Sequence, residues 1–334
     1  MKLLFNNILK KAISTKATDV HFIPSNDKIY IKFRVQDTLA PIESIQQHIY
    51  LKLLTYMKYQ AGLDVSKHNV AQSGRYTYKF KQIYFLRIST LPLSLGIESC
   101  VIRIVPQYFQ KGSDTSNLGT LYKLMNKKQG LILLSGPTGS GKSTLMYQMV
   151  MHAKEQLDLN IITVEDPVEQ LVSGITQVSI NEKAGINYAN TFKAILRCDP
   201  DIILIGEIRD AIIAKQVMHA SLSGHLVLTT IHANNCKSAL LRLKEMGLTM
   251  QEMKQALLTV LNQRLITTYN NQRKLVYEQL TKAQINHLID NDYTLPSSFS
   301  NLSTQLTQLA KAGVICEETC LLYTSPSPRD KRQS

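Results

Sequence analysis

A glycine-rich loop that ends in a lysine and a serine lies within the segment LILLSGPTGSGKST, residues 131–144. Its spacing is G-x-x-x-x-G-K-S, a pattern typical of phosphate-binding loops. Glycines let the backbone curl until several N–H groups point at one phosphate, and the lysine adds a compact positive charge. The serine hydroxyl can ligate Mg²⁺, and the N-terminus of a following helix attracts the same anion. The predicted nucleoside triphosphate site comprises Gly136, Pro137, Thr138, Gly139, Ser140, Gly141, Lys142, Ser143 and Thr144.

Four apolar runs from about residue 120 onward predict strands that are buried on both faces of a parallel sheet. Segments with helical spacing separate them, as in a sheet covered by helices on both sides. Polar residues follow the last three runs: Glu165 and Asp166, then Glu207, then His232. Because ligands of open α/β sheets bind at the carboxyl ends of the strands, we expect these residues at one edge. The runs are 131–134, 161–164, 202–205 and 226–231.

Hydrolysis of a phosphoanhydride requires a held Mg²⁺, an oriented water and neutralised charge on the γ-phosphate. We expect Ser143 and Glu207 to hold Mg²⁺, with Glu207 able instead to organise water. Glu165 is the candidate that orients or deprotonates the attacking water, because acids crowded at a strand end have raised pKa values unless a cation is near. His232 is a candidate γ-phosphate sensor or inter-domain contact. The alternative for each acid is an ordinary, solvated residue at a strand end.

No residue in the second half is an obvious charge-neutralising arginine. The first half offers Arg75, Arg87 and Arg103, all on predicted strands. One or more of them could reach phosphate across a domain or subunit boundary, and the alternative is ordinary surface charge on a sheet.

Residues 18–105 show the period-two alternation of a half-buried antiparallel sheet, as in 29–35 and 76–80. A helical stripe over 42–61, with Gly62 as its stop signal, interrupts the strands. We therefore predict an N-terminal α+β domain at 1–105, a linker at 106–119 and an α/β domain with C-terminal helices at 120–320. The remaining residues, 321–334, are rich in proline and serine and are interpreted as a disordered or artefactual tail.

The composition is that of an ordinary globular protein, with 44% hydrophobic residues in 334. No apolar stretch approaches the ~20 residues that cross a bilayer, and a targeting signal is not recognisable, so we expect a cytoplasmic location. Five scattered cysteines without a C-x-x-C pair predict reduced thiols and no zinc site. A net charge of +13 suits an anionic partner, but the basic residues are spread along the chain.

Four segments in order resemble the motifs of the ATPases that drive type II secretion and type IV pili. GPTGSGKST resembles the Walker A loop, TVEDPVE the aspartate box, RCDPDIILIGEIRD an atypical Walker B and SGHLVLTTIHANN the histidine box. The resemblance covers residues 17–265, and within the family it is greatest to the ATPases of Gram-positive competence pili. The chain has Ala211–Ala214 where relatives often carry x-E-T-A, so its side chains there differ from theirs.

This resemblance implies an α/β fold: a RecA-like P-loop NTPase domain with a mainly parallel sheet, preceded by a smaller α+β (PAS-like) domain. It implies ATP and Mg²⁺ as ligands, a homo-hexamer, and a membrane platform protein as partner at the inner face of the membrane. By position, Arg87 and Arg103 match the family's phosphate-reaching arginines, and Glu165 matches its proposed catalytic acid.

The leading hypothesis is a motor that assembles a pilus for DNA uptake. A pilus retraction or type II secretion ATPase is the alternative within the family, since the motifs do not encode direction. A motor that acts directly on nucleic acid is a different class, and we expect no direct nucleic-acid contact, because no localised basic patch or stacking motif is present. A nucleotide-gated scaffold is the fourth possibility.

Overall fold

The computed structural model describes residues 1–25, 27–35, 38–94, 96–106, 118–181, 184–270 and 273–316. The chain divides into two compact units. The first consists of Met1–Tyr108 and Glu169–Leu171, and the second of Phe109–Val168 and Val172–Ser334. Most of the linker expected at 106–119, and the tail expected at 321–334, lie outside the described residues.

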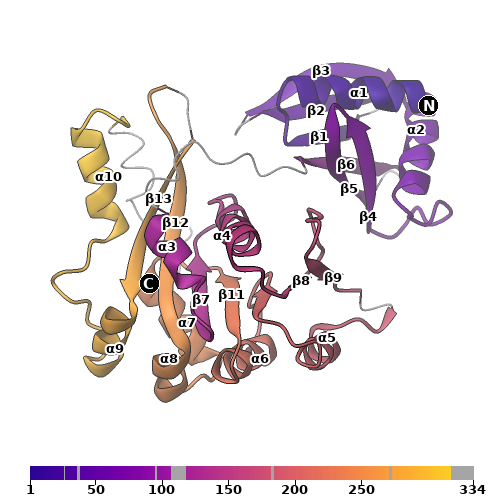
Figure 1. Cartoon of the computed structure of the whole chain (residues 1–334). Helices are drawn as coiled ribbons and strands as arrows, with labels where there is room; N and C mark the ends of the chain where they lie inside the picture. Colours follow the sequence, from indigo (N-terminus) through magenta and orange to yellow (C-terminus); the bar gives the residue numbers. More distant parts are fainter. Residues whose placement is uncertain are drawn as a thin grey trace. The chain divides into compact units, whose positions relative to one another are not determined.

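The first unit is an antiparallel sheet with two helices packed against one face (Figure 1). The strand order is β3-β2-β1-β6-β5-β4. The first helix contributes Phe5, Ile8 and Leu9 to the core, and the second contributes Tyr50, Leu53 and Met57. These side chains pack against the inward-facing side chains of the strands. The elements are α1 (Lys2–Ser14), β1 (Asp19–Ser25), β2 (Lys28–Val35), β3 (Thr38–Gln46), α2 (Gln47–Gln60), β4 (Gln72–Phe80), β5 (Gln82–Pro92) and β6 (Glu98–Pro106).

The helix expected over 42–61 is shorter than predicted. Residues 42–46 belong to β3, which pairs with β2 from Val35↔Thr38 to Lys28↔Gln46 with an irregularity after Ile31. The helix α2 begins only at Gln47, and its N-cap residue Gln46 makes no side-chain capping bond. Cross-strand pairing therefore decided the assignment of 42–46, which also fits a helical stripe.

The second unit contains a seven-stranded sheet in the order β13-β12-β7-β11-β10-β8-β9. All neighbouring strands run parallel except β12 and β13. The fold is thus α/β with a mainly parallel sheet. Its elements are α3 (Gly119–Leu124), β7 (Gly130–Ser135), α4 (Lys142–Leu157), β8 (Ile161–Glu165), β9 (Thr176–Ser179), α5 (Tyr188–Ile195), β10 (Ile202–Ile205), α6 (Ala211–Leu222), β11 (Leu226–Ile231), α7 (Cys236–Glu245), α8 (Met250–Ala256), β12 (Leu257–Thr267), β13 (Arg273–Thr281), α9 (Lys282–Asp290) and α10 (Leu302–Lys311).

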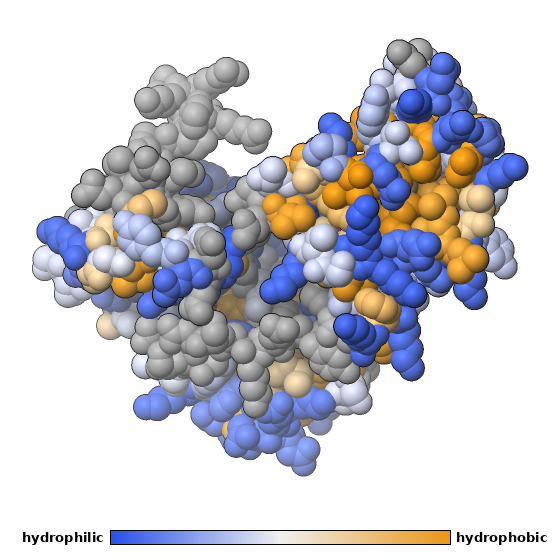
Figure 2. All heavy atoms as spheres, turned by 90° about the horizontal axis from the view of Figure 1, so that it is seen from above, coloured by the Kyte–Doolittle hydropathy of each residue, from blue (hydrophilic) through white to orange (hydrophobic). Residues whose placement is uncertain are grey.

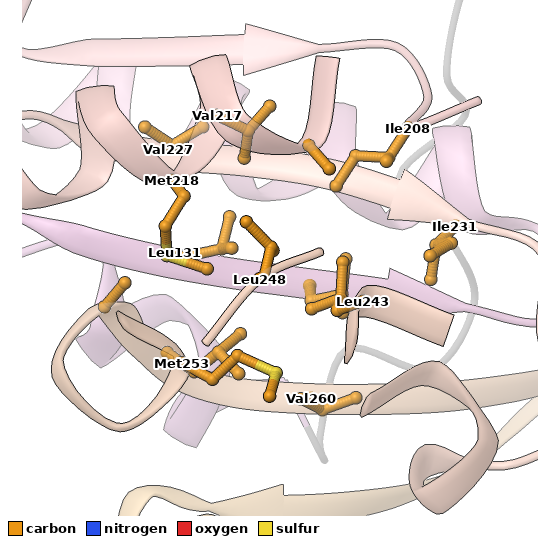
Figure 3. Packing of buried hydrophobic residues seen from close by; sticks show 14 of the residues in the cluster. Leu131, Ile208, Val217, Met218, Val227, Ile231, Leu243, Leu248, Met253 and Val260 are labelled. Atoms are coloured by element: carbon orange, nitrogen blue, oxygen red, sulfur yellow. The ribbon is translucent and has the colours of Figure 1, made fainter. Parts of the chain in front are cut away.

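Both faces of the central strands are buried, which explains why the sequence shows apolar runs and not alternation. On β7, Leu131 and Leu133 face a core shared with α6, α7 and α8. The intervening Ile132 and Leu134 face a second core shared with α3 and α4. Figure 3 shows the first of these cores, where Leu131, Val227 and Val260 from three strands meet Met218, Leu243 and Met253 from helices.

The C-terminal part of the chain contains two strands in addition to helices. Two long strands, β12 and β13, form an antiparallel hairpin, and β12 joins the parallel sheet beside β7. Helices α9 and α10 follow, and α10 packs on β13 around Leu306. Polar residues at the centre of β12 interrupt its apolar pattern, so the sequence did not reveal this strand.

Apolar side chains are gathered among charged ones on the first unit's surface in the view of Figure 2. Within the described part of the chain, no helix combines the length and apolar character that crossing a bilayer requires.

Candidate functional site

The phosphate loop connects the end of β7 to the start of α4. Three of its glycines, Gly136, Gly139 and Gly141, have φ values of 140°, 79° and 86°, which residues other than glycine rarely adopt. A Cβ on Gly136 would stand 2.6 Å from the carbonyl oxygen of Gln263 and 2.7 Å from Ser140 Oγ. Glycine is therefore required at position 136 by both conformation and space, and the loop keeps its narrow curl.

Lys142 occupies the first position of α4 and reaches back over the loop. Its Nζ donates to the carbonyl oxygens of Gly136 and Pro137 at 2.8 and 2.9 Å. Burial lowers the pKa of Lys142, the Glu207 carboxylate opposes that change, and Arg264 adds to it. Binding of an anion, such as a phosphate, would stabilise an ammonium that is desolvated in this way.

The loop fits a triphosphate by two observations. Ser140 Oγ is buried and has no hydrogen-bond partner among the described residues. The N-cap residue of α4 is Gly141, which offers no side chain to cap the helix, while Ser143 and Thr144 are exposed in the first turn. Backbone N–H groups at such a helix terminus are suitable donors to phosphate oxygens, and a hydroxyl oxygen there is a suitable ligand for Mg²⁺.

Glu207 lies two residues beyond the end of β10, within an ion-pair network. Its Oε1 is 3.2 Å from His232 Nε2, and its Oε2 is 3.5 Å from Arg209 Nε. Arg209 also donates to Asp166 Oδ2 at 2.6 Å, so it joins the residues that follow β8 and β10. Arg209 is thus a local partner of the acids.

Glu165 is the last residue of β8 and is buried, with 8% of its surface exposed. Its Oε1 accepts hydrogen bonds from Tyr147 OH at 2.5 Å and from Thr163 Oγ1 at 2.8 Å. A Cβ on Gly206 would stand 3.5 Å from the Glu165 Cα, so the segment that carries Glu207 lies directly against β8.

The predicted residues of the second unit converge on one edge of its sheet. Strand register aligns Ser135 with Ile231, and Ile205 with Val164, so the carboxyl ends of the strands, which carry the polar residues, are adjacent. Tyr188, at the start of α5, lies among these groups. Burial raises its pKa to about 12, with Arg209 opposing and the carboxylates of Asp166, Glu207 and Glu165 contributing.

Arg87 and Arg103 lie in the first unit, directly opposite each other on β5 and β6. Arg87 Nε donates to Ser73 Oγ at 3.2 Å, and Arg103 Nε lies 3.0 Å from Asp19 Oδ1. They are part of a cross-strand row that reads Arg75, Arg87, Arg103, Asp19 and Arg34. Their role at the phosphate loop stays a prediction.

Several residues at this site were missed by the sequence analysis, and three of them are consecutive on β12. Gln263 Nε2 donates to the Ser140 carbonyl oxygen at 2.8 Å. Asn262 Nδ2 joins Ser135 Oγ to the carbonyl oxygen of Ala233, at 2.8 and 2.9 Å. Arg264 donates to the Asn234 carbonyl oxygen at 3.0 Å. Polar residues inside a strand that is otherwise apolar were the available signal.

Comparison with known proteins places this site in a family. Residues 1–312 match the family described as "Type II/IV secretion system protein". The chain is 39% identical over 266 residues to "Competence protein ComGA" of Bacillus subtilis (strain 168), covering 78% of this chain and 74% of that protein. It is also 39% identical over 274 residues to "Type II secretion system protein E" of Pectobacterium carotovorum subsp. carotovorum, but covers only 54% of that longer protein.

Solved structures agree with the sequence relatives. The pilus retraction motor PilT with bound ADP superposes with a TM-score of 0.76 at 25% identity, over 98% of each chain. The ATPase DotB of Legionella pneumophila superposes with a TM-score of 0.73 at 19% identity, over 96% of this chain and 94% of that one, which supports the fold. The phosphate loop, the acidic strand ends and these similarities agree, and the chain belongs to the type II/IV secretion system protein family.

Proposed function

We propose that this protein is an ATP-hydrolysing motor with a RecA-like core and a PAS-like first unit, which powers assembly of a competence or type IV-like pilus for DNA uptake. The observation that carries the proposal is the convergence of Lys142, Glu165, Glu207 and His232 on one sheet edge beside a glycine loop. Membership of the secretion family and 39% identity to a competence protein support the specific role.

The chain's own residues suit each task of phosphoryl transfer to water. When bound, Mg²⁺–ATP would supply a γ-phosphate whose developing charge the metal helps to neutralise. Backbone N–H groups of the loop and the Lys142 ammonium would hold the phosphates, and Ser143 and Glu207 would hold the metal. Glu165, buried at the carboxyl end of β8, would orient a water and accept its proton. His232 would report on the γ-phosphate through its contact with Glu207.

The family also supports wider proposals about the assembly. We propose a homo-hexamer in the cytoplasm, at the inner face of the membrane, that acts on an integral-membrane platform protein without direct contact to nucleic acid. Nucleotide-driven movement of one unit against the other would transmit force, and Arg87 and Arg103 would complete the site from the first unit.

Turnover by the purified protein tests the enzymatic part. We expect magnesium-dependent ATP hydrolysis, and we expect Lys142→Ala and Glu207→Gln to reduce kcat by at least about a hundredfold. Lys142→Ala removes positive charge that stabilises the transition state, and Glu207→Gln weakens the proposed binding of Mg²⁺. Lys127→Ala and Glu155→Gln change exposed residues of the same unit and serve as matched controls. Full turnover by Lys142→Ala would contradict the role of the loop.

The 25% identity to a pilus retraction motor favours one alternative within the same family. Deletion of the gene distinguishes the two: loss of pili supports assembly, and surplus pili support retraction. Strong stimulation of ATP hydrolysis by DNA, with a steep salt dependence, would instead support a motor that acts on nucleic acid.

A further inference from the structure

We propose that Tyr147 is a positioning residue that orients Glu165 and keeps this carboxylate ionised, and that it links the phosphate-binding helix to the proposed general base. This inference rests on the proposed function and deepens it. Tyr147 was not among the residues that the sequence motifs indicated.

The contact is direct and lies inside the protein. Tyr147 is on α4 and is only 3% exposed, and its hydroxyl donates to Glu165 Oε1 at 2.5 Å. Thr163 lies on the strand that ends in Glu165, and its Oγ1 donates to the same carboxylate oxygen at 2.8 Å. Two neutral donors on one carboxylate oxygen favour the ionised form and restrict rotation of the carboxylate.

A neighbouring amide sets the direction of the Tyr147 hydrogen bond. The Val172 N–H donates to Gln177 Oε1 at 2.6 Å, which identifies the other atom of that amide as Nε2. Gln177 Nε2 donates to the Tyr147 hydroxyl oxygen at 2.9 Å. The phenol therefore accepts from Gln177 and directs its own proton to Glu165.

The phenol keeps this proton throughout the range in which the enzyme would work. Burial raises the pKa of Tyr147 well above its usual value, and the Glu165 carboxylate adds to the effect. Tyr147 is consequently a permanent donor, and it does not compete with Glu165 as a base.

The position of Tyr147 along α4 connects it to the phosphate loop. Ser143, the proposed magnesium ligand, precedes it by four residues and therefore lies on the same side of the helix. A single rigid helix would thus hold the metal ligand at its first turn and the support of the base one turn later. Such an arrangement fixes the base relative to the phosphates, as a near-attack geometry requires.

The variant Tyr147→Phe removes the donor and keeps the ring that packs in the core. We expect nucleotide affinity within about twofold of wild type and kcat lower by about tenfold to a hundredfold, as for loss of a hydrogen bond to a charged group. We also expect the acidic limb of the kcat–pH profile to move to higher pH, because the carboxylate loses a bond that favours its ionised form.

Tyr122→Phe is the matched control, because Tyr122 is a half-buried tyrosine of the same unit that stacks on His152, away from Glu165. If Tyr147→Phe does not fold, as judged by its melting temperature, Gln177→Leu replaces it. Gln177→Leu leaves the phenol without its orienting donor, and the same upward movement of the acidic limb is expected.

Three outcomes separate the inference from the proposed function. A wild-type kcat and pH profile in Tyr147→Phe overturns the inference. If Glu165→Gln is inactive in the same assay, the motor assignment still stands. A lower kcat with an unchanged acidic limb also overturns it, since a merely structural role would give that result. Absence of ATP hydrolysis by the wild-type protein instead defeats the proposed function itself.

Discussion

At the scale of single residues, the site combines charge with burial. Lys142 has 9% of its surface exposed, and carbonyl oxygens of the loop are its hydrogen-bond acceptors. Its lowered pKa, caused first by burial, means that the charged form is less favourable in the folded protein than in water. The folded protein therefore loses stability on this account at neutral pH and regains it as the pH rises toward 10.5.

Nucleotide binding should reverse this effect, because phosphate oxygens favour the ammonium and raise its pKa. We expect the affinity for a non-hydrolysable ATP analogue to decline in the alkaline range before the ordinary lysine value of 10.5 is reached. Binding there should take up protons, which calorimetry in two buffers of different ionisation enthalpy measures. Proton release, or an affinity that stays constant up to that pH, would contradict the role of Lys142.

At the scale of elements, one strand near the C-terminus stabilises the first turns of two helices. Glu278 on β13 is 3% exposed, and its Oε1 and Oε2 accept from the N–H groups of Cys236 and Leu302, at 2.7 and 2.9 Å. One carboxylate thus caps the first turns of both α7 and α10. This arrangement fixes α7, which directly follows the loop that carries His232.

The isosteric change Glu278→Gln tests that double cap. The new amide group would present N–H atoms to at least one backbone N–H, so one helix loses its acceptor and an unsatisfied donor stays buried. We expect the free energy of unfolding to fall by about 1–3 kcal/mol, measured by urea denaturation. Glu245→Gln, an exposed change on α7, should alter stability by less than about 0.5 kcal/mol. Equal stability of the two variants would show that the cap is unimportant.

At the scale of the whole molecule, each unit has its own hydrophobic core, and the predicted site residues are distributed over both units. Glu165, Glu207 and His232 are in the second unit, whereas Arg87 and Arg103 are in the first. Both arginines are exposed on the sheet face opposite α1 and α2, where their removal creates no cavity. The catalytic role proposed for Arg87 can therefore be tested with little effect on folding, whereas Arg103 also pairs with the buried Asp19.

We expect Arg87→Ala and Arg103→Ala to lower kcat by at least about a hundredfold, as for other arginines that neutralise transition-state charge. The melting temperature of Arg87→Ala should stay close to that of wild type, whereas Arg103→Ala also removes the partner of the buried Asp19 and should melt at a lower temperature. Lys79→Ala, exposed on β4 of the same sheet, is the control. Mixing Arg87→Ala with Glu165→Gln protein decides whether the arginine acts in its own subunit. Activity regained in the mixture indicates action across subunits, and wild-type kcat in both arginine variants refutes the assignment.

Local patterns were sufficient to predict the phosphate loop and the strands β7, β8, β10 and β11. A glycine loop needs only its own backbone to present N–H groups, and strands buried on both faces leave a continuous apolar run. The rule that ligands bind at the carboxyl ends of parallel strands then predicted which residues follow those strands at the site. The boundary between β3 and α2 was predicted wrongly, because Gln46 carries no capping signal.

The sequence by itself thus determined the glycine-rich loop and the polar strand ends, because these depend on neighbours in the chain. Only the tertiary structure decided what supports them. Gln263 reaches Ser140 across 123 residues, and Tyr147 reaches Glu165 from a helix to a strand. Such hydrogen bonds depend on which strands become neighbours and on the direction of each side chain, and a linear pattern of polar and apolar residues contains neither.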